Sequence, residues 1–164
     1  MNAVARWIRG KAFSLGLRKG PPPLDDLIQP EGKEHYDRTC ALVTEHGWAC
    51  IYVGDHANET GNFGYTVGLS GKGLPELLFV IDESDIAMAM LNAIATRLVE
   101  HGPGVPDGFA PFPGQQLRLR NIYPVEFYRK CVMAGIWAIE HDAMAGATGM
   151  QVVLAEADGS FPRD

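Results

Sequence analysis

A glycine-rich stretch, GLSGKG at residues 68–73, contains the residue types that bind phosphate in nucleotide-binding loops. A P-loop needs glycine, four residues and then Gly-Lys-Ser/Thr, but Thr66 stands at the first fixed position and Gly73 at the last. The dinucleotide fingerprint fails because it requires glycine where Glu76 stands. Both motifs also lead into a helix, whereas a strand is predicted here. We therefore interpret the stretch as a hairpin connection in which Gly71 and Gly73 adopt positive φ.

The same stretch also approaches the nucleophile elbow, GxSxG, with Ser70 at the nucleophile position. Lys72 occupies the place of the second glycine, and no helix is predicted after it. The pattern therefore indicates that Ser70 is a turn residue.

Histidine and carboxylate residues are the other candidates for chemistry. The sequence has no HExxH motif and no pair of histidines four residues apart with an acid between them. His46, Asp55 and His56 bracket a predicted strand, and three ligands that meet at one end of a sheet could hold a metal. Sequence does not show such convergence, so we predict no metal ligands and keep metal-assisted catalysis at these residues as an alternative.

Glu76 begins the apolar run PELLFVI, where an unpaired carboxylate would be costly to bury. It must be solvated or held by a specific donor. Aromatic residues on two strands and a Gly/Pro-rich loop at 102–114 could frame a pocket. We therefore predict a ligand-binding or protein-interaction module without an identified cofactor. The candidate ligand contacts are Trp48, Tyr65, Thr66, Lys72 and Glu76. An enzyme is the alternative, either flavin-dependent with Tyr65 and Thr66 as contacts, or metal-assisted as above.

The elements that position these residues follow from periodicity and turn signals. Strands are predicted at 48–53, 63–69, 75–81, 115–123 and 150–156, and helices at 30–46, 84–101 and 124–137. The mixed order predicts an α+β fold with a mainly antiparallel sheet of about five strands and about three helices. A barrel-like closure of this sheet is the alternative.

Charge divides the chain into two parts. Residues 1–20 hold five basic residues and no acid, which leaves 9 basic against 20 acidic residues, a net charge of −11, in residues 21–164. The acidic body disfavours nucleic acid as a partner. The basic end is a candidate for weak membrane-surface contact. GPPPLDD at 20–26 acts as a stiff separator, so we predict an extension at 1–23 and a single domain at 24–164.

Three cysteines, Cys40, Cys50 and Cys131, form no regular disulfide framework, which favours a reducing cytoplasmic location. No apolar run approaches the length of a membrane span. The partner is predicted to be a small molecule or a host protein, and the oligomeric state does not follow from sequence.

Four motifs in order, HGWACIYV, FGYTVGL, LPELLFV and the terminal QVVLAEADGSFPRD, resemble one known family. It is the bacterial and phage domain of unknown function 4262, and Leu91-Asn92 matches its helix motif. The likeness covers roughly residues 46–164. The chain departs from the pattern at Ala155-Glu156 and in the loop-rich segment before Gln115. The resemblance implies an outline for the fold and no reaction. A weaker likeness to flavin-binding split barrels concerns only the central strand pair.

Overall fold

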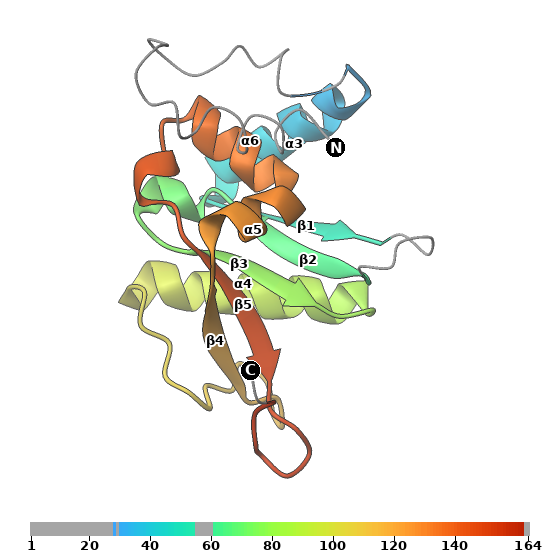
Figure 1. The fold of residues 1–164 in the computed structure, drawn as a ribbon, viewed down its shortest axis with the longest axis vertical. Coiled ribbons are helices and arrows are strands. Elements are labelled where there is room, and N and C mark those ends of the chain that lie inside the picture. The colour runs from blue at the N-terminus through green and yellow to red at the C-terminus, as the bar shows by residue number, and fades with distance from the viewer. Residues whose placement is uncertain (1–27, 29, 55–60, 163–164) are drawn as a thin grey trace.

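Five strands form one sheet in the order β1-β2-β3-β5-β4 (Figure 1). The structure, a computed structural model of the 164-residue chain, describes residues 28, 30–54 and 61–162. The strands are β1 (Ala49–Val53), β2 (Phe63–Val67), β3 (Glu76–Val80), β4 (Leu117–Ile122) and β5 (Gly149–Leu154). The helices are α3 (Pro30–His46), α4 (Ser84–His101), α5 (Pro124–Lys130) and α6 (Val132–Glu140), with short 3₁₀ turns η1 (Leu69–Lys72) and η2 (Met144–Gly146).

The sheet is mixed rather than mainly antiparallel, which corrects the prediction. β5 returns between β3 and β4 and pairs parallel to β3. It pairs antiparallel to β4. The chain reaches β5 only after helices have carried it across the sheet, and such crossovers permit parallel pairing. The barrel-like alternative is also wrong, because β1 and β4 stand at opposite ends of the strand order and the sheet does not close.

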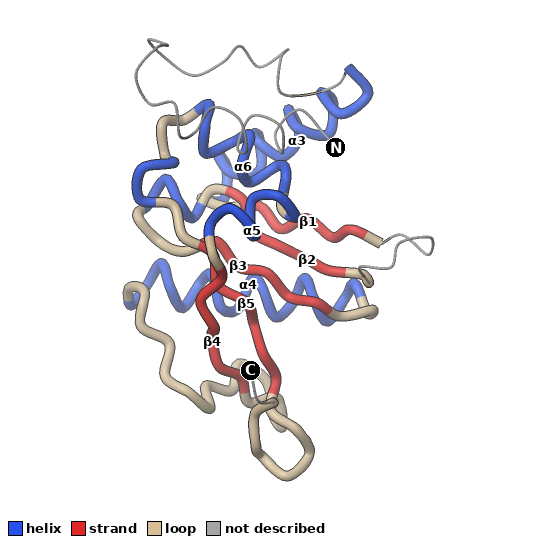
Figure 2. The backbone as a smooth tube through the Cα atoms, viewed as in Figure 1, coloured by secondary structure: helices blue, strands red, loops and turns tan. Residues whose placement is uncertain are grey.

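Helices cover the two faces of the sheet unequally (Figure 2). α4 lies along one face, and α3, α5 and α6 gather on the other, toward one end of the strands. The alternation of side chains along each strand divides the core accordingly. Leu77 and Phe79 pack with α4, whereas Leu78 between them packs with Phe127 of α5 and Ile136 of α6. The sheet therefore separates two apolar cores.

The part of the chain that the structure describes contains four α-helices, one more than the three predicted. The predicted helix at 124–137 is two helices, because the backbone of Cys131 adopts φ −97 and ψ 69, which lies outside the helical region. Gly135, expected to weaken that helix, lies buried inside α6. The bounds predicted for α3 and α4 are confirmed, and Gly47 ends α3 with φ +90 and a hydrogen bond of 2.8 Å from its N–H to the Val43 carbonyl.

The basic extension at 1–23, with its predicted membrane-surface contact, lies outside the described residues. Within the described ranges, the helices are all too short or too polar to cross a membrane. The single domain at 24–164 stays a prediction.

Candidate functional site

Glu76, the first residue of β3, is fully buried and accepts four hydrogen bonds from protein groups. Its Oε1 accepts from the Gly68 N–H at 2.8 Å, the Ser70 N–H at 3.0 Å and the Ser70 hydroxyl at 2.9 Å. Its Oε2 accepts from the Thr66 hydroxyl at 2.7 Å. A buried carboxylate is tolerated when its lone pairs are satisfied in this way. The sequence left two alternatives for Glu76, exposure to solvent or a specific hydrogen-bond donor. The structure shows the second, with four hydrogen bonds.

The glycine-rich stretch therefore has backbone amides directed at an anion, and the anion is the chain's own carboxylate. Gly68 precedes η1 and Ser70 is its second residue, so their N–H groups have no partner within the turn. β2 and β3 are adjacent and antiparallel on either side of η1, which confirms the hairpin interpretation. Gly73 has φ +69 as predicted, but the second positive φ belongs to Gly68, at +105, and not to Gly71.

Gly71 is needed because no side chain fits at this position, and not because of its backbone angles. A Cβ at this position would lie 2.6 Å from the Trp137 ring. The ring of α6 thus packs directly on the turn, and α6 and η1 support one another.

Burial raises the pKa of the Glu76 carboxyl, and the hydrogen bonds from Ser70, Thr66 and Gly68 oppose that rise without cancelling it. The carboxylate in turn helps to raise the pKa of the buried Tyr128 and Cys131 side chains, for which desolvation is the larger cause. No described residue forms a hydrogen bond with the Tyr128 hydroxyl.

The structure brings together two of the five predicted contact residues, Thr66 and Glu76. Tyr65 is 3% exposed and packs in the core on the side of α6. Trp48 lies on the α4 side, where its indole N–H donates to Asn92 Oδ1 at 3.0 Å. Lys72 is exposed, and its chain passes beside Gly47. A ligand role for these five residues stays a prediction.

The positions of the described residues give less support to the two enzymatic alternatives than to a binding role. In the flavin version, Tyr65 and Thr66 are both buried. In the metal version, Asp55 and His56 lie outside the described residues, and His46 is an exposed side chain 3.7 Å from its neighbour Glu45. Among the residues that the structure does describe, no three histidine, cysteine or carboxylate groups are close enough to share a metal.

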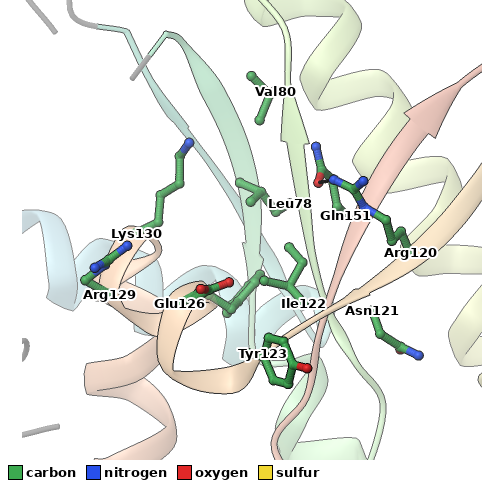
Figure 3. A pocket seen from close by; sticks show the side chains of 11 residues that line it. Leu78, Val80, Arg120, Asn121, Ile122, Tyr123, Glu126, Arg129, Lys130 and Gln151 are labelled. Carbon is green, nitrogen blue, oxygen red and sulfur yellow. Dashed lines mark hydrogen bonds between the residues drawn. The ribbon is translucent and has the colours of Figure 1, made fainter. Parts of the chain in front are cut away.

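Sequence reasoning missed a surface cavity of about 500 Å³ between α5 and the bare end of the sheet (Figure 3). Leu78, Ile122 and Phe127 form much of its apolar floor. Figure 3 shows Arg129 and Lys130 of α5 on one side of this floor, and Arg120 beside Gln151 on the other. The remaining lining residues are Val80, Asn121, Tyr123 and Glu126. We call this cavity the β4–α5 pocket.

Two of the three cationic side chains in the pocket have a contact that holds them in place. Arg120 donates to Gln151 Oε1 at 2.6 Å. The Lys130 ammonium lies 4.8 Å from the centre of the Phe63 ring, a cation–π contact. Arg129 is exposed at the rim.

The pocket exists because the helices leave this end of the sheet uncovered. Gly149 of β5 has no side chain, and an added Cβ would lie 2.4 Å from the Phe127 ring, so α5 sits close to the sheet at that point. Two residues further along β5, Gln151 lines the pocket. Val80 at the end of β3 is 42% exposed.

The sequence did contain part of the signal. LRLR at 117–120 places two arginines on one face of a strand, and Arg129-Lys130 ends a short helix. Their convergence depends on the parallel pairing of β5 with β3, which places Gln151 and Arg120 in register beside Leu78. The predicted Gly/Pro-rich loop contributes no residue to the pocket; its Phe109 bridges to Leu117 at the start of β4.

A family model described as domain of unknown function (DUF4262) matches residues 42–164. The match includes the Glu76 turn and the complete β4–α5 pocket. No curated protein matches the chain, and no solved structure does.

Proposed function

The chain belongs to the DUF4262 family, and we propose that it is a binding module whose β4–α5 pocket holds an anionic group with an apolar portion beside it. One observation carries the proposal. Three cationic side chains, Arg120, Arg129 and Lys130, converge on one cavity in a chain whose net charge is −6.

Local charge decides what can enter the pocket. Glu126 is the acidic residue among those that line it. Cations placed on opposite sides of an apolar floor raise the local concentration of anions and can bind a carboxylate or phosphate from two directions. Guanidinium groups suit both anions because their donors form a planar fork. The acidic remainder of the surface directs anions away from other regions.

The apolar residues set the second requirement. Leu78 and Ile122 form the floor between the cations, and Tyr123, which is 79% exposed, stands at the margin. A volume of about 500 Å³ lies within the range of small-molecule sites. A free inorganic anion would leave this floor uncovered, so we infer that the bound group is attached to an apolar or aromatic portion.

A cytoplasmic location and a bacterial or phage origin belong to the same proposal. Support for the location is the set of three free cysteines, of which Cys131 is buried. Support for the origin is the resemblance of the motifs alone.

The test is titration of the protein with phenyl phosphate at low ionic strength, followed by calorimetry and by thermal unfolding. Arg129→Gln removes one exposed charge of the pocket, and we expect the affinity to weaken by about tenfold or more, the effect of losing one charge-assisted hydrogen bond. Lys33→Gln removes an exposed charge on α3 and serves as the matched control.

Lys72→Gln distinguishes the pocket from the site that the sequence suggested. Binding that survives Lys72→Gln and weakens in Arg129→Gln supports the pocket. Binding that depends on Lys72 alone places the ligand at the glycine-rich turn and contradicts the proposal, as does an affinity that all three substitutions leave unchanged.

A further inference from the structure

We propose that the partner of this module is an acidic protein segment that adds as an extended strand to the free edge of β4 and places a carboxylate in the β4–α5 pocket. This inference rests on the proposed anion-binding function and names its partner. Edge strands present unpaired backbone groups and are regularly used to bind extended peptides.

The free edge of β4 is defined by hydrogen bonds at its start. The Leu117 N–H donates to the Phe109 carbonyl and the Leu117 carbonyl accepts from the Gly108 N–H, both at 2.9 Å, so both groups of Leu117 point away from β5. Because the direction alternates along a strand, the N–H and C=O groups of Leu119 and Asn121 point the same way. No described residue forms a hydrogen bond with these outward groups.

The edge adjoins the pocket directly. Arg120 stands between Leu119 and Asn121, on the face shared with Gln151 and Leu78, and it lines the pocket. A residue opposite Arg120 on an added strand would direct its side chain to the same face. The next residue on that face would lie opposite Ile122, which belongs to the apolar floor. The expected segment therefore has an acidic residue and an apolar residue two positions apart.

Charge favours a partner of this kind over a second copy of the chain. Two copies of β4 paired antiparallel would bring Arg118 and Arg120 of one close to those of the other, and like charges on paired strands are destabilising. The other edge strand, β1, has the sequence ACIYV and carries no charged side chain. Only β4 of these two edges combines free backbone groups with cations.

The sharpest test uses two substitutions at one position. Leu119 has an outward N–H like Asn121 but does not line the pocket. Leu119→Pro removes this N–H but no hydrogen bond to β5, and proline is tolerated at such an edge position. Leu119→Ala keeps that N–H and serves as the matched control. The probe is a fluorescein-labelled octapeptide in which threonine alternates with glutamate and valine, measured by fluorescence polarisation at low ionic strength, and circular dichroism verifies that both variants fold.

We expect Leu119→Pro to weaken peptide binding by about tenfold, the effect of one lost backbone hydrogen bond, and Leu119→Ala to change it by less than about twofold. Phenyl phosphate binding should be equal in the two variants, which separates strand addition from anion binding. Peptide affinity that is equal in the two variants, or phenyl phosphate binding without peptide binding, would overturn the inference and leave the proposed function intact. A dimer that forms without peptide and is lost in Leu119→Pro would make a second copy the occupant and also overturn it.

Discussion

The Thr66 hydroxyl donates to Glu76 Oε2 at 2.7 Å and at the same time accepts from the Leu77 N–H at 2.8 Å. The register pairs of β2 and β3 end at Tyr65 and Leu78. Beyond that pair, the Leu77 N–H donates to the side-chain oxygen of Thr66 instead of to a backbone carbonyl. Thr66 thus extends the pairing of the two strands by one residue and connects it to the buried carboxylate that holds the glycine-rich turn.

The first prediction concerns this hydroxyl. Thr66→Val keeps the shape of the side chain but leaves the Leu77 N–H and Glu76 Oε2 each without one partner in a fully buried site. We expect the free energy of unfolding to fall by about 2–4 kcal/mol, since each unsatisfied group costs about 1–3 kcal/mol. Thr66→Ser keeps the hydroxyl and should lose less. Urea denaturation measures both, and a loss in Thr66→Val no larger than the loss in Thr66→Ser would show that the hydroxyl contributes no more than the methyl group.

The second prediction concerns pH. Burial raises the pKa of Glu76 in the folded protein above its ordinary value of 4.5, so protonation favours the folded state. The stability that depends on this group is therefore greatest below pH 4.5 and declines as the pH rises through the folded-state pKa. Relative to Glu76→Gln, whose side chain does not titrate, the wild-type protein should become less stable from pH 4 to pH 8.

Unfolding curves of the two proteins across that range provide the measurement. Glu34→Gln, which removes an exposed carboxylate on α3, is the control and should track the wild type closely. A wild-type advantage that grows with pH would mean that the four donors outweigh burial, which would reverse the direction of the pKa shift.

The third prediction concerns the close contact between Gly149 of β5 and Phe127 of α5. Gly149→Ala would place a methyl group 2.4 Å from the Phe127 ring, so the helix must move away from β5. Overpacking of this kind costs about 1–3 kcal/mol of stability. Because α5 carries Arg129 and Lys130, phenyl phosphate affinity should fall as well.

Gly104→Ala is the comparison for this substitution, because a Cβ at Gly104 meets no atom within 4 Å and the residue has no positive φ. We expect it to change stability by less than about 0.5 kcal/mol. Thermal unfolding and calorimetry of the two variants settle the matter. Gly149→Ala with wild-type stability would show that Phe127 moves without cost.

Local patterns were sufficient for most individual elements. Apolar spacing placed α3 and α4 at their observed bounds, and β-branched and aromatic runs located all five described strands within two residues at each end. The helix predicted from Pro124 to Trp137 was wrong in one respect, because periodicity continues through Cys131 although the backbone does not. α5 packs on β5 at Gly149 and α6 packs on the turn at Gly71, and periodicity along the chain does not encode either contact.

The candidate site was harder to predict. Glu76 drew attention because a carboxylate at the start of an apolar run needs partners, and its four donors lie within ten residues of it in sequence. The β4–α5 pocket was not predicted because Leu78, Arg120 and Gln151, which line it together, come from strands that lie tens of residues apart in sequence. The sequence around each of these residues contains no pattern that predicts their contact in the folded protein.

By itself, then, the sequence determined the helices apart from the break at Cys131, the strands, the hairpin at the glycine-rich turn and the membership of the chain in its family. Each of these depends on short-range periodicity, turn chemistry or motif order. Only the tertiary structure decided that β5 lies between β3 and β4, that the sheet is mixed and open, and that three cations meet over an apolar floor. Strand order and pairing direction depend on long-range packing that residues near one another in sequence do not encode.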